Sequence, residues 1–217
     1  MTRQTITVDV VSDVMCPWCY IGKRRLEKAI GLINDLDVTV HWRPFQLDPT
    51  LPREGKDRET YLNEKFGGPE RAAGIYSNIR QAGETEDLDF QFDKIEVSPN
   101  TLDCHRLIRW AKTPETQEAV VERLFKAYFI DGENLSDDEV LVRIAQEAGM
   151  DGERVRESLR QEADMVATRS EIQQAQQIGV TGVPCFIIDN KYAVMGAEAA
   201  STLADAIRQA ANERAGS

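Results

Sequence analysis

ITVDVVSDVMCPWCYIGKRRLEKAIGLI, residues 6–33, sets the architecture of the chain. Ile6, Val8 and Val10 alternate with other residues in a segment rich in β-formers, which predicts a strand. After the cysteines, apolar residues recur at the spacing of a helix, at Ile21, Leu26, Ala29, Ile30 and Ile33. Two cysteines two residues apart therefore open a helix directly after a strand.

The position of the two cysteines predicts a reactive dithiol. Pro17 would take the first helical position, where its missing N–H is not needed, so Cys16 would lie at or just before the first turn. Free N–H groups and the positive end of the helix dipole stabilise a thiolate there. We expect Cys16 to be the nucleophile, with an exposed sulfur, and Cys19 to attack a mixed disulfide formed at Cys16.

A zinc site and an inert structural disulfide are the alternative interpretations of this pair. Zinc needs about four ligands. The other candidate ligands are single residues without paired spacing, namely Cys104, Cys185, His41 and His105. Redox chemistry is therefore the favoured hypothesis, and we expect no metal site.

Composition narrows the classes of partner. The 217 residues carry 26 Lys and Arg against 37 Asp and Glu, a net charge of −11, which argues against nucleic acid as a partner. No apolar run is long enough to span a bilayer, so we expect no membrane association. The first residues alternate like a strand and do not form a signal sequence, which predicts a cytoplasmic protein. Four cysteines in such a chain are no disulfide framework.

The remaining patterns divide the chain into two parts. Residues 38–42 read as a second strand, which with the first strand and helix predicts a parallel βαβ unit. Patterns from about residue 56 to 178 are nearly all helical, with a capping box at Ser136 and Glu139. Residues 183–188 and 192–195 then form a hairpin, and a last helix follows. We predict one domain from residues 1–47 and 179–217, and a helical insertion from residues 48–178.

These motifs resemble a known family. CPWC at a strand–helix junction, with Gly-Val-Pro before a hairpin, is similar to the thioredoxin superfamily, and the helical insertion is similar to its DsbA-like branch. The FrnE-type subgroup is resembled by SDVMCPWCYIG at 12–22, WRPFQL at 42–47, NTLDCHRL at 100–107 and GVTGVP at 179–184. The resemblance implies an α/β thioredoxin-like fold, a central mixed sheet flanked by helices, with a large all-helical insertion. It also implies a thiol–disulfide oxidoreductase acting on protein or small-molecule disulfides.

The resemblance also implies where substrate binds. It makes Pro184 the family's cis-proline, whose missing N–H leaves an edge where a substrate backbone could pair with Val183. Pro17 and Trp18 of the CPWC motif would contact the same substrate. The alternative for Pro184 is an ordinary trans proline at the start of a strand.

A second group of candidate substrate-binding residues lies in the insertion. The resemblance places the segment with Asn100, His105 and Arg106 in a wall facing the active site. There an imidazole or guanidinium could stabilise a thiolate or bind a substrate carboxylate. The alternative is a solvated helix face with ordinary surface charges.

The chain departs from the family pattern near the cysteines. Thioredoxins carry a buried acid six residues before the first cysteine, where this chain has Val10, and Asp9 should point to the other face. Asp13 could handle protons or simply cap the helix. Trp18 replaces the histidine of strongly oxidising periplasmic relatives. We therefore expect a more reducing couple.

The remaining cysteines and His41 have simpler explanations. Cys185 follows Pro184 and could form an alternative disulfide or a metal contact, but a buried strand residue pointing away from Cys16 is favoured. Cys104 shares a helical stripe with Leu107 and Ile108, which predicts a core position. His41 lies within a strand, and a structural role is favoured for it.

Two other functions stay open on sequence alone. A glutathione-dependent transferase or isomerase, of the kappa-class or 2-hydroxychromene-2-carboxylate isomerase type, has a serine at the Cys16 position and lacks Cys19. A non-catalytic chaperone-like module would use the groove beside Pro184 to hold peptides. We expect no cofactor, with glutathione as a co-substrate in the first of these alternatives, and a monomer or homodimer.

Overall fold

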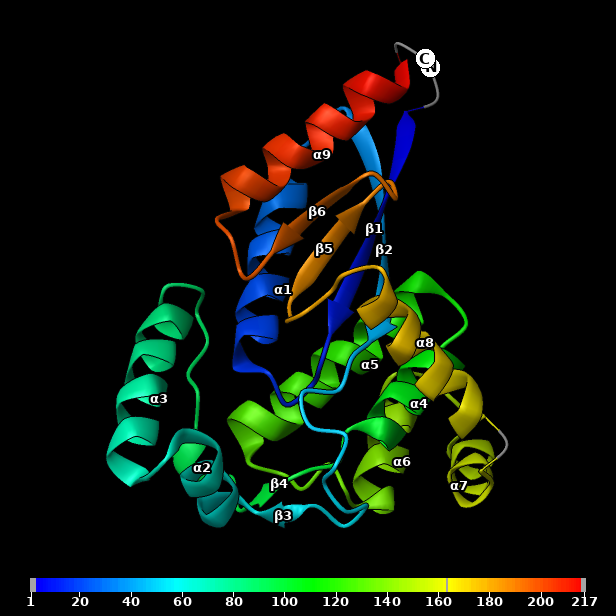
Figure 1. The fold of residues 1–217 in the computed structure, drawn as a ribbon. Coiled ribbons are helices and arrows are strands. Elements are labelled where there is room, and N and C mark those ends of the chain that lie inside the picture. Colours follow the sequence, from blue (N-terminus) through cyan, green and yellow to red (C-terminus); the bar gives the residue numbers. More distant parts are fainter. Residues whose placement is uncertain (1–2, 163, 216–217) are drawn as a thin grey trace.

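The computed structural model describes residues 3–162 and 164–215, and its centre is a four-stranded mixed sheet in the order β2-β1-β5-β6. β1 (Gln4–Ser12) pairs in parallel with β2 (Leu36–Pro44), and α1 (Pro17–Gly31) connects them, so the predicted βαβ unit is confirmed. β5 (Cys185–Ile188) pairs antiparallel with both β1 and β6 (Tyr192–Met195). This arrangement places the start of α1 and the start of β5 at the same end of the sheet (Figure 1).

Helices cover both faces of the sheet. α1 and α9 (Ala200–Ala215) pack on each other and bury the face that carries Val8, Val10 and Phe186. On the other face, Val11 and Cys185 pack with Ala175 of α8 (Met165–Gln177). The alternation predicted for the first strand therefore sends consecutive residues to two different helical layers.

The insertion is a set of helices at the end of the sheet where β1 ends and α1 begins (Figure 1). Its elements are α2 (Arg58–Phe66), α3 (Pro69–Glu84), the 3-10 turn η1 (Phe92–Lys94), α4 (Leu102–Trp110), α5 (Pro114–Lys126), the π-helical turn η2 (Ala127–Asp131), α6 (Asp138–Glu147), α7 (Gly152–Arg160) and α8. It also contains two short strands, β3 (Lys56–Asp57) and β4 (Val97–Ser98), which pair antiparallel. The expectation of an all-helical insertion is corrected at this point.

Two smaller expectations also change. The second strand is longer than predicted, because pairing with β1 extends from Leu36 to Pro44. The cap of α6 is Asp137, whose carboxylate accepts from the Glu139 N–H, and not Ser136. Within the described residues, no helix combines the length and apolar character that a membrane span needs.

Candidate active site

Cys16 is the N-cap residue of α1, with extended backbone, and Pro17 takes the first turn as predicted. No side chain caps this helix end, so the positive end of the α1 dipole lies at Cys16 without a competing side chain. The thiol donates to the Val183 carbonyl oxygen at 3.7 Å, so residues 167 apart in the chain meet here. The expected exposed sulfur is corrected: Cys16 is only 5% exposed because the loop before β5 covers it.

Cys19 lies beneath Cys16, almost fully buried within the core that α1 shares with the sheet. Burial, and after it the hydrogen bond and charge of Cys16, raise the pKa of Cys19 well above its usual value. The Ser12 hydroxyl and a backbone hydrogen bond from Asp13 lower the pKa of Cys19. Cys19 therefore holds its proton as a thiol, which suits a group that acts second.

The loop before β5 is fitted closely against α1. The Val183–Pro184 peptide bond is cis, and the Pro184 carbonyl accepts from the Gly196 N–H at 2.8 Å. Gly22, one turn after the dithiol, faces Pro184 so closely that an added Cβ would lie 2.9 Å from Pro184 Cγ. Gly22 therefore permits the approach that places Val183 on Cys16. Of the motif's two middle residues, Pro17 is buried and Trp18 is 37% exposed.

Asp13 and His105 are buried together beside the dithiol. The Asp13 carboxylate accepts from the Leu47 N–H at 2.7 Å and from the Met15 N–H at 3.5 Å, and it does not cap α1. His105 Nε2 lies 3.4 Å from Asp13 Oδ1 without the alignment of a hydrogen bond. The histidine is 2% exposed. It therefore does not belong to a solvated face.

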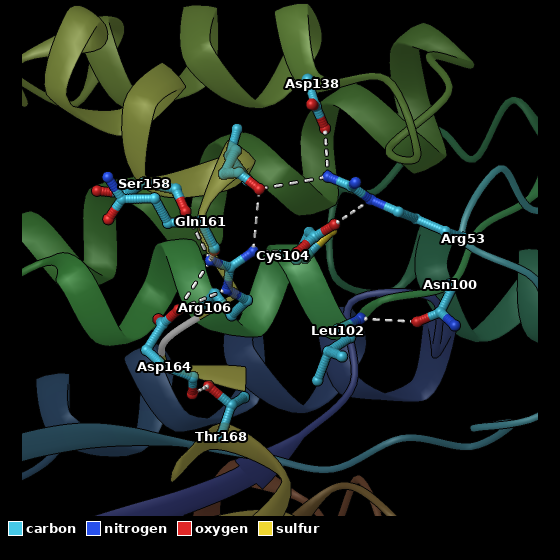
Figure 2. A network of polar contacts seen from close by, with 12 residues as sticks. Arg53, Asn100, Leu102, Cys104, Arg106, Asp138, Ser158, Gln161, Asp164 and Thr168 are labelled. Atoms are coloured by element: carbon cyan, nitrogen blue, oxygen red, sulfur yellow. Dashed lines mark hydrogen bonds and ion pairs between the residues drawn. The ribbon is translucent and has the colours of Figure 1, made fainter. Parts of the chain in front are cut away.

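The other two candidates from the insertion hold the structure together. Asn100 donates to the Leu51 carbonyl at 2.6 Å and accepts from Gln46, which fixes the loop after β2. Arg106 is fully buried and binds Asp103, Asp164 and the backbone carbonyls that end α7 (Figure 2). The Arg106 guanidinium therefore does not reach the dithiol, because it binds the segment that connects α7 to α8.

The third and fourth cysteines are core residues. Cys185 packs with Val11, Phe45, Ala175 and Val180, on the sheet face opposite to that of Cys16 and Cys19. Burial raises the pKa of its thiol. The side chain of Cys104 is buried in the main core, with its thiol 3.7 Å from the Leu135 carbonyl. Both agree with the favoured interpretations. Within residues 3–162 and 164–215, no cluster of three metal-ligating side chains occurs.

The alternation of β1 determines which of its side chains face the dithiol. Val10 is buried on the dithiol face, and Asp9 on the other face binds Arg43 Nε at 2.6 Å. His41 is half-buried in β2 beside Asp9, which agrees with a structural role. No acid therefore stands where thioredoxins carry theirs among the described residues of β1.

Ser12 and Gly22 are the residues that sequence reasoning missed as parts of the site. Gly22 carried a signal, because a glycine inside an otherwise favourable helix often marks a close approach. Ser12 carried none. Its hydroxyl approaches Cys19 only because β1 ends beneath α1.

Comparisons with known proteins agree with this geometry. The model of the DSBA-like thioredoxin domain family matches residues 7–208. A probable DsbA oxidoreductase from Streptomyces coelicolor is 35% identical, with a TM-score of 0.88, covering 96% of this chain and 91% of that one. Uncharacterized protein YwbO of Bacillus subtilis is 28% identical over 185 residues, 85% of this chain and 87% of the relative.

A more distant likeness concerns the fold alone. The structure of a 2-hydroxychromene-2-carboxylate isomerase has a TM-score of 0.72 at 14% identity, covering 96% of this chain and 98% of that one.

Proposed function

Because this chain belongs to the DSBA-like thioredoxin domain family, we propose that it is a thiol–disulfide oxidoreductase in which Cys16 and Cys19 cycle between dithiol and disulfide. The observation that carries the proposal is the Cys16 sulfur at an uncapped helix start, above a buried Cys19 that retains its proton. Cys16 attacks a disulfide sulfur of the substrate and releases one substrate thiolate. Cys19 then attacks Cys16, which releases the second thiol and oxidises the pair by two electrons.

The substrate is a protein or small-molecule disulfide, and it meets the enzyme at two surfaces. Trp18 presents apolar surface next to Cys16, and Val183 offers backbone beside the same sulfur. A substrate sulfur bonded to Cys16 must therefore lie between them. The four motifs shared with the FrnE-type subgroup support placing the chain in that branch of the family.

Insulin reduction with dithiothreitol as electron donor tests the function. We expect Cys16→Ser to abolish turnover, and Cys19→Ser to accumulate a mixed disulfide at Cys16 that mass spectrometry detects. Cys185→Ser, which alters a buried thiol on the opposite sheet face, is the matched control and should keep its activity.

Two other results would contradict the proposal. Turnover of a glutathione-dependent isomerisation that survives in Cys19→Ser would indicate an isomerase. Binding of reduced insulin without any turnover by the wild type would indicate a chaperone-like module.

We also propose a cytoplasmic location and a monomeric or dimeric state. Cys104 and Cys185 lie in separate core clusters, so they do not form a structural disulfide with each other, which suits a reducing compartment. Cell fractionation tests the location, and sedimentation of the purified protein tests the assembly.

A further inference from the structure

A small cavity lies between the ends of β1 and β2 and helices α4 and α5. The volume open to the centre of a water molecule is about 10 Å³, which is close to the smallest volume that holds one ordered water. Val14, Ile108 and Val121 form its apolar wall. Ser12, at the end of β1, and His105, in α4, also line the cavity.

Those two residues bring buried polar atoms that lack partners. Ser12 Oγ and His105 Nε2 are both inaccessible to solvent, and both lack a hydrogen-bond partner of good geometry among the described residues, although the Ser12 hydroxyl approaches the Cys19 thiol. Leaving such atoms unsatisfied is costly, and buried waters in proteins typically bind polar atoms that no protein group satisfies. One water in this cavity would accept from the Ser12 hydroxyl and donate to the imidazole nitrogen.

Cys19 needs a proton acceptor, and the chain lacks the usual one. Its thiol must lose a proton when it attacks Cys16, yet the position of the thioredoxin acid is Val10 in this chain. Ser12 lines the cavity at the end of β1, just before the turn that leads to the dithiol, and its hydroxyl lowers the pKa of Cys19. Ser12 therefore connects the buried thiol to the cavity.

His105 is the base that the cavity offers. The charged residues lining it are Arg43, bound to Asp9, and Arg109, bound to Glu171, and arginine does not release its proton. Histidine exchanges a proton near neutral pH. The Asp13 carboxylate, 3.4 Å from Nε2, would stabilise the charged imidazolium once it forms.

We propose that Ser12, one buried water and His105 form the path by which Cys19 loses its proton during the resolving step, with Asp13 as the stabilising charge. This inference rests on the proposed function and names its proton acceptor. As Cys19 Sγ bonds to Cys16 Sγ, the bond between Cys16 and the substrate sulfur breaks. The electron pair leaves with the substrate thiolate. The Cys19 proton passes through Ser12 and the water to His105 Nε2, and the substrate thiolate takes a proton from solvent.

The reaction with one equivalent of 5,5′-dithiobis(2-nitrobenzoate) separates the two chemical steps. Attack by Cys16 releases the first thionitrobenzoate, and attack by Cys19 on the mixed disulfide releases the second. In stopped-flow absorbance we expect Ser12→Ala and His105→Gln to leave the first phase unchanged and to slow the second by about tenfold or more at neutral pH. Glutamine can hold the water but cannot accept the proton, so it isolates the role of the base.

The pH profile of the second phase distinguishes a proton path from a packing defect. In the wild type the rate should depend only weakly on pH, because a residue of the chain takes the Cys19 proton. In His105→Gln it should rise, by nearly tenfold per pH unit between about pH 6 and 9, because solvent must then take the Cys19 proton. The titratable and charged groups around this path are unchanged in the variant. They are Asp13, Cys16, Arg43 and Arg109, together with Tyr61, Cys104 and Tyr128, which interact with Asp13.

Two controls complete the experiment. Ser98→Ala removes another buried hydroxyl without a partner, from β4 outside the cavity, and should alter neither phase. Cys19→Ser should release one thionitrobenzoate only. Equal second-phase rates and pH profiles in the wild type, Ser12→Ala and His105→Gln would overturn the proton path. A single equivalent from the wild type would instead overturn the proposed function.

Discussion

Gly22 shows how one missing side chain shapes the site. An added Cβ would lie 2.9 Å from Pro184 Cγ and 3.1 Å from Phe186 Cζ, and both belong to the loop and strand that cover Cys16. Gly22→Ala should therefore lower the free energy of unfolding by about 1–3 kcal/mol through overpacking. Urea unfolding measures this. Gly74→Ala, in α3 with open space around the position, should instead stabilise by about 0.5–1 kcal/mol, and equal effects at both sites would refute the close approach.

Trp18 offers a second test at the residue scale. A histidine here would place a cation beside the Cys16 thiolate and stabilise the reduced form. Trp18→His should raise the reduction potential by about 30 mV, roughly tenfold in the equilibrium with glutathione. Equilibration in a glutathione redox series measures the shift. Trp18→Phe, which removes the indole without adding charge, should change the potential little, and a potential in Trp18→His equal to that of the wild type contradicts the argument.

Sequence reasoning succeeded where chemistry is local. Cys16, Cys19 and Pro17 were placed correctly because the end of a strand and the start of a helix can be read from adjacent residues. Burial of Cys16 and the unpartnered nitrogen of His105 could not be predicted, because both depend on segments far away in the chain. Arg106 was assigned to the site, but the α7–α8 segment binds its guanidinium (Figure 2).

At the scale of elements, a cluster of charges joins α1 to α5. Lys23 is 2% exposed and contacts Glu118, Glu122 and Glu27, and Arg24 also binds Glu122. Burial opposes the charge on Lys23, but the two carboxylates of α5 outweigh it and raise its pKa. The helix that carries the dithiol is thereby anchored to the insertion.

The cluster predicts a pH dependence of stability. Burial alone would raise the pKa of Glu122, but the hydrogen bond from Arg24 and the charge of Lys23 hold it below its usual value. Its contribution is therefore complete above about pH 4.3, the ordinary pKa of glutamate, and is lost as the pH falls through the lower folded value. Glu122→Gln should cost about 2 kcal/mol at neutral pH. In urea unfolding this difference should narrow below about pH 4.3.

A control separates this cluster from overall charge. Glu162→Gln removes one negative charge from an exposed position of a chain with net charge −11. It should change stability by no more than about 0.5 kcal/mol. A difference for Glu122→Gln that stays constant down to pH 3 would contradict the role of its ionised form.

Elements were predicted better than their ends. The helices and the hairpin follow from periodicity, but β3 and β4 are two residues each and carry no periodic signal. The cap of α6 was assigned to Ser136 by its spacing to Glu139, whereas Asp137 forms it. Neighbouring residues that can both cap a helix cannot be distinguished without the backbone geometry.

For the whole molecule, the core runs from the sheet into the insertion. The Tyr20 ring of α1 stacks on Phe125 of α5, with centroids 4.9 Å apart and planes inclined by 9°. Trp42 of β2 meets the same ring edge-on at 6.3 Å. Figure 1 shows α5 crossing below the end of the sheet. The division into one domain of residues 1–47 and 179–217 and an insertion of residues 48–178 follows the change of pattern in the sequence, and it stays a prediction.

The continuous core predicts that both parts unfold together. Trp42 reports on the sheet and Trp110 on the insertion, so variants that keep one of them, with the other tryptophans changed to Phe, follow each part separately. Their urea transitions, monitored by fluorescence, should coincide. Phe125→Ala, made in each variant, should shift both transitions by the same amount, about 3–5 kcal/mol, because the ring packs against both parts. Leu159→Ala, in a buried position on α7, should also shift both. Separate transitions, or a shift only in the transition followed by Trp110, would contradict this prediction. They would mean that the insertion folds as its own unit and that the stability of α1 does not depend on it.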